Sequence, residues 1–467
     1  MTEHVSSQTT WKFPKTFWVA NVVELLERAA WYGVFVVITL YLSRILGYSD
    51  IEAGLLSGFL SAGLYFLPTF SGAIADHMGF KKALLLAFGL LTIGYASMWV
   101  LPTLLESAGL VSYGREVEFM GLKESWHKWL FVPIMLVIMI GGSFIKSVIT
   151  GTVATETSEA NRARGYSIFY AMVNIGAFSG KTIVKPLRES LGNEGLVVLN
   201  LFAAGMTLLA FFGVLFFFRS ERRREATRTM SDVWNALLAV CSRGRLITLI
   251  LIITGFWMVQ HQLYATMPKY VLRMAGEGAS PSWYANVNPA VVVLTVGFVT
   301  QLMRKVSALG SMTLGMFIMP VSAFCMAAGN MMNPEPLLGL HPVAFMMIVG
   351  IAFQGLAESF ISPRFLEYFS LQAPRGEEGL YLGFSHLHSF ISSILGFGLS
   401  GFLLDKYCPS ADQFATTAEW TAAKANAHYI WFVFVGIALV SALSLVVFGW
   451  ITRRMDEKAA KPSEVAS

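Results

Sequence analysis

RSERRREATRTMSDVWNALLAVCSRGR, residues 219–245, lies near the middle of the chain and separates two long apolar halves. It holds seven arginines, whereas continuous apolar runs precede and follow it. Lysine and arginine are enriched in the cytoplasmic loops of membrane proteins. The segment therefore predicts a cytoplasmic linker between two membrane-embedded bundles.

The composition of the chain excludes most classes of protein. Of its 467 residues, 55% are hydrophobic and 13% are charged, and the mean hydropathy is +0.59. Soluble domains carry about 25% charged residues, so this chain could not cover a water-facing surface. A soluble enzyme, a disordered regulator and a fibrous protein are excluded, which leaves a polytopic membrane protein. The three cysteines are widely spaced, so neither a disulfide framework nor a thiolate metal site is expected.

Twelve apolar runs are long enough to cross a bilayer, since a spanning helix needs about 20 mostly apolar residues. The runs are continuous rather than alternating, which excludes a membrane β-barrel. We therefore predict an all-α polytopic membrane protein with 12 transmembrane helices in two six-helix bundles. The predicted divisions are an N-terminal bundle (1–218), a cytoplasmic linker (219–245), a C-terminal bundle (246–455) and a cytoplasmic tail (456–467). The predicted spans are 15–45, 51–76, 81–104, 129–153, 162–186, 194–219, 245–273, 282–304, 308–331, 341–370, 378–405 and 426–452.

Basic residues in the short loops predict the orientation. Pairs of them follow the second, fourth and twelfth spans: Lys81 and Lys82, Arg162 and Arg164, and Arg453 and Arg454. Together with the linker, they lie on one side of the membrane if both termini are cytoplasmic, which satisfies the positive-inside rule. We therefore expect a multi-pass protein of the cell (inner) membrane with both termini in the cytoplasm.

The most informative residues are ionisable side chains inside the predicted spans. A charge at the bilayer centre costs about 2.5–3.5 kcal/mol on insertion scales, so such a group is a functional candidate by default. Glu24, Glu27 and Arg28 share one face of the first span, because residues three and four apart are neighbours on a helix. Span four carries Lys146 and span ten carries Glu358. One interpretation is an inert buried ion network; the other is a glutamate that titrates in step with conformation, as proton coupling requires.

Two short motifs resemble those of known transporters. Residues 72–82, GAIADHMGFKK, resemble the loop motif of the major facilitator superfamily, with His77 where an arginine is usual. Two six-helix halves around a central basic loop are also the layout of that superfamily. In the first span, Glu24-Leu-Leu-Glu27-Arg28 resembles the E-x-x-E-R signature of the proton-coupled oligopeptide transporter (POT) family.

Further positions in both halves are similar to the POT family. Residues 166–178, YSIFYAMVNIGAF, look like its aromatic-aromatic…Asn-x-Gly signature in span five. Residues 256–262 (FWMVQHQ), Asn288-Pro289 and the stretch from Glu358 to Pro363 stand where that family has similar residues in spans seven, eight and ten. The resemblance covers roughly residues 13–400, and the chain is identified as a divergent member of the POT family with the major facilitator fold.

The resemblance implies a proton-coupled symporter that imports small peptides or peptide-like solutes by alternating access. The proton-coupling residues that it implies are Glu24, Glu27, Arg28, Lys146 and Glu358. Glu358 would also hold the amino terminus of a peptide, and Lys146 or Arg28 its carboxylate. The other predicted substrate-binding residues are aromatic or polar: Trp31, Tyr32, Tyr65, Asn174, Trp257, His261 and Asn288. A zwitterionic peptide needs such a carboxylate at one end and a cation at the other.

Departures from the family pattern leave the substrate open. Phe35 stands where the family has an arginine that helps to bind the peptide carboxylate. The first alternative is therefore a major facilitator transporter of a non-peptide polar solute, such as a nucleoside, an anion, a siderophore or a modified peptide. The second alternative is a transceptor, a membrane receptor that binds its ligand without flux.

No enzymatic activity, metal or cofactor is expected, and the proton is the expected coupling ion. A G-x-x-x-x-G-K-[ST] stretch is absent from the sequence, so ATP is not the expected energy source. The expected partners are a di- or tripeptide or a peptide-like solute, protons and the lipid bilayer, and no nucleic acid. The histidines inside spans, His261, His386 and His388, are expected to be neutral and hydrogen-bonded, with His261 the best functional candidate among them. Lys181 and Lys185 are expected to snorkel to the interface, and the alternative is that they line the outer vestibule.

Overall fold

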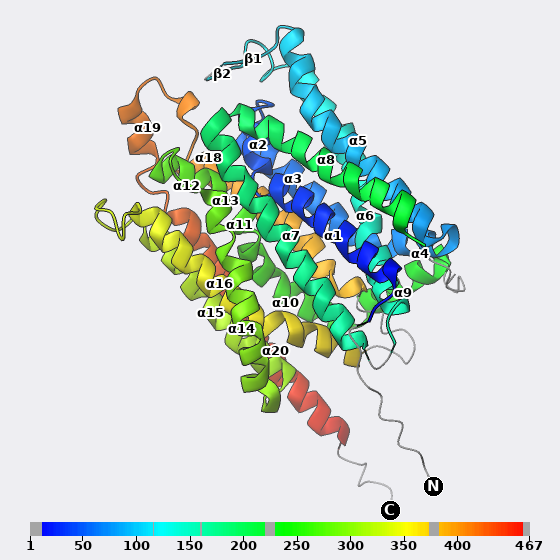
Figure 1. Cartoon of the computed structure of the whole chain (residues 1–467). Helices are drawn as coiled ribbons and strands as arrows, with labels where there is room; N and C mark the ends of the chain where they lie inside the picture. Colours follow the sequence, from blue (N-terminus) through cyan, green and yellow to red (C-terminus); the bar gives the residue numbers. More distant parts are fainter. Residues whose placement is uncertain (1–11, 115, 159–160, 220–228, 373–382, 461–467) are drawn as a thin grey trace, which may run out of the picture. The chain divides into compact units, whose positions relative to one another are not determined.

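Helices make up almost all of the structure (Figure 1), a computed structural model that describes residues 12–114, 116–158, 161–219, 229–372 and 383–460. Within these ranges the named strands are β1 (Ser112–Tyr113) and β2 (Val117–Glu118), which form one short antiparallel pair. A helix satisfies its backbone hydrogen bonds within one segment, as a chain in hydrocarbon requires. The structure confirms the predicted all-α class.

The chain divides into two compact units. Unit 1 is Met1–Tyr48 with Gly63–Val233, and unit 2 is Ser49–Ala62 with Trp234–Ser467. These units differ from the predicted bundles in one segment, because residues 49–62 group with the second unit. This segment holds most of helix α3 (Asp50–Phe66), so that α3 contributes to both units.

Unit 1 is built around the first helix of the chain. Helix α1 packs against α7 and α8, while α5 packs against α6 and α8. The elements of this unit, besides β1, β2 and the end of α3, are α1 (Lys15–Phe35), α2 (Ile38–Arg44), α4 (Pro68–Met78), α5 (Phe80–Ser107), the 3₁₀ helix η1 (Trp126–Leu130), α6 (Phe131–Thr155), α7 (Arg162–Leu191) and α8 (Glu194–Phe217).

Unit 2 is organised around α10, α15 and α16. Helix α15 packs against α16 and α20, α10 packs against α18 and α20, and α14 packs against α16. The unit boundary falls within α9 (Met230–Ser242). The other elements are α10 (Gly244–Gln260), α11 (Gln262–Ala265), α12 (Met267–Ala275), α13 (Pro281–Tyr284), α14 (Val287–Leu302), η2 (Met303–Lys305), α15 (Ala308–Ala328), α16 (Pro342–Leu371), α18 (Leu387–Tyr407), η3 (Ala411–Gln413), α19 (Thr417–Ala423) and α20 (Tyr429–Ala460).

Among the described residues, fewer than the twelve predicted helices are candidates to span a membrane by length and apolar composition. Nine are long and apolar enough to cross a membrane, and counting two bent pairs as spans raises the number to eleven. The bent pairs are α1 with α2, at 46°, and α3 with α4, at 47°. Helix α7, which matches the predicted fifth span, does not reach this standard, because polar residues such as Asn174 and Lys181 lie along it. The number twelve is therefore not confirmed.

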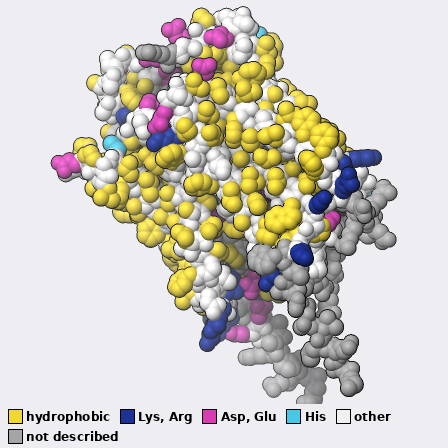
Figure 2. All heavy atoms as spheres, in the orientation of Figure 1, with side chains coloured by type: hydrophobic (Ala, Val, Ile, Leu, Met, Phe, Trp, Pro, Cys, Tyr) yellow, Lys and Arg dark blue, Asp and Glu magenta, His cyan; other side chains and the backbone are white. Residues whose placement is uncertain are grey.

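The outer surface of the helices is that of a membrane protein. Figure 2 shows hydrophobic side chains over much of the visible face and charged side chains toward its edges. On α8, for example, the exposed large hydrophobic residues are Leu201, Leu208, Leu209, Phe212, Leu215, Phe216 and Phe217. Exposing apolar surface to water costs about 25 cal/mol per Å², whereas lipid is the solvent that such a surface requires.

Candidate functional site

Glycines bring α7 against α1 in unit 1. A Cβ atom added to Gly180 would lie 2.9 Å from the backbone nitrogen of Gly33, and one added to Gly176 would lie 2.8 Å from the Cβ of Arg28. Small residues allow the backbones of membrane helices to approach closely. The Asn174-x-Gly176 motif thus has a packing role, because its glycine seats α7 on the helix that carries the intramembrane charges.

The predicted charged face of α1 is an ion-paired group. The Nε atom of Arg28 lies 2.5 Å from Oε2 of Glu27 and 3.3 Å from Oε1 of Glu24. Both glutamates are buried, and the arginine side chain is 21% exposed. Buried charges are stable only when they are paired, and here one guanidinium serves two carboxylates. The structure confirms that the three residues share a face, while their role in proton coupling stays a prediction.

Lys146 on α6 lies beside this ion-paired group. It is close enough to Glu24 and Arg28 to interact with both electrostatically. Its Nζ atom also lies 6.0 Å from the ring centroid of Tyr65, at the limit of a cation–π contact. Unit 1 therefore brings together five of the residues predicted from sequence: three on α1, Lys146 on α6 and Tyr65 near the end of α3.

Tyr32 connects the ion-paired group to a second lysine. The Cζ atom of Arg28 lies 5.9 Å from the ring centroid of Tyr32, and the Nζ atom of Lys181 lies 5.1 Å from the same centroid. The prediction that Lys181 snorkels to the interface is wrong, because its side chain is only 2% exposed. The close crossing of α1 and α7 at Gly180 holds the neighbouring Lys181 inside the unit.

Two other predicted binding residues in unit 1 make contacts within their own helices. The Trp31 ring stacks on Phe35, with centroids 4.4 Å apart. The Nδ2 atom of Asn174 donates to the backbone oxygen of Tyr170, 2.8 Å away, one turn earlier in α7. Phe35 is buried, so this position offers an aromatic surface where the POT pattern has a cation.

In unit 2, Glu358 on α16 accepts hydrogen bonds from two amides. Its Oε2 atom lies 2.8 Å from Nε2 of Gln260 on α10 and 3.3 Å from Nδ2 of Asn288 on α14. Asn288 was expected at the site, whereas Gln260 was not singled out. The sequence feature that could have identified Gln260 is its position inside the motif of span seven, three residues after Trp257 and one before His261.

Trp257, His261 and a second histidine form an aromatic cluster in unit 2. The imidazole of His388 stacks on the Trp257 indole, with centroids 5.2 Å apart and planes at 11°, and the His261 ring lies 6.1 Å from the same indole. His261 occupies the break between α10 and α11. The hydroxyl of Ser389 lies 2.9 Å from His388 Nδ1, and that of Ser392 lies 3.4 Å from His261 Nδ1. These contacts confirm the expected hydrogen bonding of both histidines.

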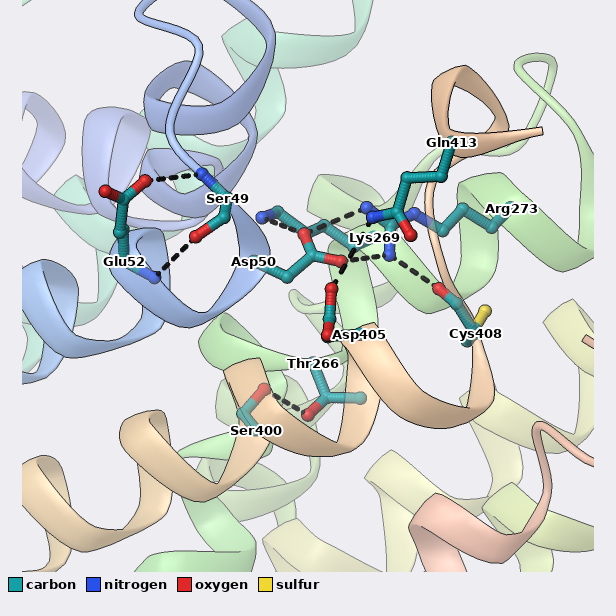
Figure 3. A network of polar contacts seen from close by, with 10 residues as sticks. All are labelled: Ser49, Asp50, Glu52, Thr266, Lys269, Arg273, Ser400, Asp405, Cys408 and Gln413. Carbon is teal, nitrogen blue, oxygen red and sulfur yellow. Dashed lines mark hydrogen bonds and ion pairs between the residues drawn. The ribbon is translucent and has the colours of Figure 1, made fainter. Parts of the chain in front are cut away.

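An ion cluster at the start of α3 was not predicted from the sequence. Asp50 lies 2.7 Å from the Nζ atom of Lys269 and 2.6 Å from Nη1 of Arg273, both on α12 (Figure 3). Arg273 also donates to the backbone oxygen of Cys408 at 2.6 Å. Asp50 and Lys269 are buried. In the sequence, Asp50, Lys269 and Arg273 stand near the ends of two predicted spans, where charged residues ordinarily face water. No sequence pattern indicates that they pair with one another.

Metal ligation finds no support in the part of the chain that the structure describes. Within those ranges, no group of three or more histidine, cysteine, aspartate and glutamate side chains could hold a metal ion. The polar groups described above in the two units are ion pairs, amides and aromatic rings.

Charged residues held inside membrane-spanning helices mark pathways for solutes or ions. Comparison with known families agrees: the chain belongs to the Major Facilitator Superfamily, whose profile matches residues 21–336. It is accordingly a transporter and not an enzyme.

Several known proteins resemble the chain along most of its length. Multidrug resistance protein MdtH of Photorhabdus laumondii is 24% identical over 384 residues, which cover 82% of this chain and 84% of that protein. Dipeptide and tripeptide permease B of Shigella dysenteriae is 25% identical over 448 residues, covering 82% and 86%. A solved structure from work on proton dependent oligopeptide transporters has a TM-score of 0.70 at 18% identity, covering 94% and 99%. The POT family transporter PepTSo has a TM-score of 0.69 at 16% identity, covering 95% and 99%. These structural likenesses confirm the major facilitator fold.

Proposed function

We propose that this protein is a divergent POT family member, a proton-coupled symporter that imports small peptides or peptide-like solutes by alternating access. The observation that carries the proposal is the buried ion-paired group in unit 1, where Glu24 and Glu27 compete for one arginine, Arg28. The similarity to dipeptide and tripeptide permeases and to solved POT structures supports the peptide class. The protein resides in the cell (inner) membrane with both termini in the cytoplasm, and it needs no cofactor besides the coupling proton.

Glu358 is the group that receives the amino end of the solute. Two amide donors, Gln260 and Asn288, fix the orientation of this carboxylate from α10 and α14. An ionised carboxylate forms strong charge-assisted hydrogen bonds with an ammonium. Trp257 and His261, three residues before and one after Gln260, supply an aromatic wall for a side chain of variable shape, which suits a carrier of many peptides.

Arg28 and Lys146 receive the carboxylate end, and the glutamates of α1 link that step to the proton. When a proton binds Glu27, the guanidinium of Arg28 loses one of its two carboxylate partners and can engage the solute. When the proton leaves Glu27 on the cytoplasmic side of the membrane, the ion pair with Arg28 forms again and the solute is released. A proton that crosses the membrane supplies about 2.3 kcal/mol per 100 mV, so one or two protons suffice for uphill import.

One observation favours a second candidate function. Phe35 is buried and stacks on Trp31, where the POT pattern has a carboxylate-binding arginine. A carrier of a non-peptide polar solute, such as a nucleoside or a peptide with a modified carboxyl end, has no need of a cation at that position.

Uptake by proteoliposomes under an imposed pH gradient tests the proposal. We expect the purified protein to accumulate dialanine when the lumen is alkaline, and a protonophore to abolish the accumulation. Nucleosides, inorganic anions, a siderophore and capped peptides complete the panel. Accumulation of one of these without dialanine would establish the second candidate. Binding of dialanine without flux would instead establish a transceptor.

A further inference from the structure

We propose that helix α9 lies in the surface of the membrane, on the side that holds the arginine-rich linker, and binds anionic lipid there through Trp234 and Leu238. The partner is a lipid surface, and the site is one face of a single helix. This interaction is separate from transport and does not depend on which solute the protein carries.

Helix α9 has two apolar faces, of which only one is buried. The buried face consists of residues about one turn apart: Val233, Leu237 and Val240. At about 100° per residue, Trp234 and Leu238 point to a different side of the helix, and each is 52% exposed. Met230, one turn before Trp234, is exposed on the same side. A stripe of large apolar residues therefore runs along the outside of α9.

A third side of α9 is polar. Its exposed residues include Ser231, Asn235 and Ser242. With 13 residues the helix is about 20 Å long, too short to span a hydrocarbon core of about 30 Å. A helix that combines a buried face, an exposed apolar face and a polar face fits the boundary between lipid and water, because each face then meets surroundings of its own kind.

The C-terminal end of α9 is fixed close to three spanning helices of unit 2. Arg243, directly after α9, donates through Nη1 to the backbone oxygen of Gln372, just after α16, at 2.8 Å. Arg245, in the first turn of α10, donates through Nη1 and Nη2 to the two carboxylate oxygens of Asp456 on α20, at 2.9 Å each. Helix α9 therefore ends where α10 begins and where α16 ends.

Trp450 on α20 marks the depth of this region. Its side chain is exposed, and the Cζ atom of Arg454 lies 3.7 Å from its ring centroid. Tryptophan is enriched at the level of the lipid headgroups. Asp456, the partner of Arg245, follows Trp450 by six residues, about 9 Å along the helix. The end of α9 thus lies near the headgroup layer, where its apolar stripe reaches lipid.

The charge around α9 indicates which lipid it meets. The segment 219–245 carries seven arginines and three acidic residues, a net charge of +4. Basic residues beside a membrane surface attract anionic headgroups, and this attraction adds to the insertion of apolar side chains. The bilayer is already present at the start of α10, whereas a partner protein would have to approach it. An anionic lipid surface is therefore the occupant of the stripe.

Fluorescence quenching at single positions along α9 tests the proposal. In the full-length protein, Cys241→Ser and Cys325→Ser remove the two thiols that are not buried, whereas Cys408 is buried and stays. A cysteine introduced by Trp234→Cys or Leu238→Cys then carries a nitrobenzoxadiazole label, in nanodiscs of phosphatidylcholine with and without phosphatidylglycerol. We expect acyl-chain bromination of the lipids to reduce the fluorescence at both positions, and iodide in the water to have little effect.

Asn235→Cys is the matched control, because Asn235 directly follows Trp234 and lies on the polar side. We expect the reverse result there: iodide reduces the fluorescence and brominated lipid does not. The Leu238→Cys variant keeps Trp234, so it still reports the position of α9 if the loss of the tryptophan weakens binding. Phosphatidylglycerol should increase the quenching by brominated lipid at position 238, and a high salt concentration should reverse that increase.

Three results would overturn the proposal. Iodide quenching that is equal at positions 234, 235 and 238 would place the apolar stripe in water. Protection of positions 234 and 238 from both quenchers would mean that protein covers the stripe, whether another part of the chain, a second copy or a partner. Quenching by brominated lipid that does not respond to phosphatidylglycerol would exclude the selection of anionic lipid.

Discussion

Glu27 is the carboxylate nearest to Arg28, at 2.5 Å, and is buried. Glutamine at this position has the shape of protonated glutamate but cannot release a proton. In Glu27→Gln we therefore expect pH-driven accumulation of dialanine to fall to the equilibrium level, while exchange of internal for external solute continues. Uptake and counterflow in the same proteoliposomes measure the two quantities.

Glu189→Gln is the control for that experiment, because Glu189 lies in the same unit but is exposed and pairs with Lys185. It should accumulate solute as the wild type does. If Glu27→Gln also accumulates dialanine at the wild-type rate, the carboxylate of Glu27 takes no part in proton coupling.

Glu358 provides a second prediction at the scale of one residue. Hydrogen bonds to charged groups contribute about 1.5–3 kcal/mol. Loss of such a bond to the ammonium of dialanine in Glu358→Gln should therefore raise the KM for dialanine by about 10–100-fold. N-acetyl dialanine, which has no ammonium, should bind the variant and the wild type alike. Glu367→Gln, on the same helix, changes an exposed glutamate paired with Arg364 and serves as the control. An equal loss for both ligands would contradict a role in binding the amino group.

Neighbours within one helix could be predicted from the sequence, whereas partners on different helices could not. Glu24, Glu27 and Arg28 are three and four residues apart, and the helical repeat alone places them on one face. Gln260 and Glu358 are 98 residues apart, and Asp50 and Lys269 are 219 apart. No local pattern joins such pairs, so Gln260 and the Asp50 cluster emerged only from the structure.

At the scale of elements, the crossing of α1 and α7 depends on Gly180. A Cβ atom there would meet the carbonyl oxygen of Ala29 and lie 2.9 Å from the nitrogen of Gly33. Backbone atoms cannot yield as flexible side chains do, and overpacking of this kind costs about 1–3 kcal/mol. We therefore expect Gly180→Ala to lower the thermal midpoint of the purified protein and to reduce uptake, since the helices that carry Arg28 and Lys181 move apart.

Gly205→Ala is the matched control within the same unit. Gly205 lies inside α8, and a Cβ atom added there would meet nothing within 4 Å. Alanine favours a helix over glycine by about 1 kcal/mol, so this variant should be as stable as the wild type or more so. A Gly180→Ala variant with unchanged thermal midpoint and uptake would show that the close crossing is not required.

The apolar runs predicted where the helices lie, but only one of the two helix bends has a signal in the sequence. Pro68 marks the bend between α3 and α4, because proline lacks an N–H group and its ring clashes with the preceding turn. The 46° bend between α1 and α2 falls at Val36 and Val37, and no proline or glycine stands there. The predicted span 15–45 therefore gave no signal of the break that the structure contains.

At the scale of the whole molecule, α3 stands out because it belongs to both units. Its first part, in the segment Ser49–Ala62, is held in unit 2 by the Asp50 ion pairs and by a contact between the hydroxyls of Ser61 and Ser393, 2.9 Å apart. Its last residues, from Gly63 onward, belong to unit 1. In the proposed alternating access the two units move as bodies, and one helix cannot stay attached to both. We therefore expect the attachment of residues 49–62 to unit 2 to break in every transport cycle.

A reversible cross-link between α3 and α18 tests this requirement. The Ser61 and Ser393 oxygens are 2.9 Å apart, close enough for cysteines at both positions to form a disulfide with a bond of about 2.05 Å. We expect oxidation of the Ser61→Cys/Ser393→Cys variant to abolish dialanine uptake and a reductant to restore it. Each single variant, treated with the same oxidant, controls for the native cysteines, of which Cys241 is exposed. Wild-type uptake by the fully oxidised double variant would mean that residues 49–62 remain with unit 2 throughout the cycle, and that the moving bodies are the compact units with their boundary inside α3.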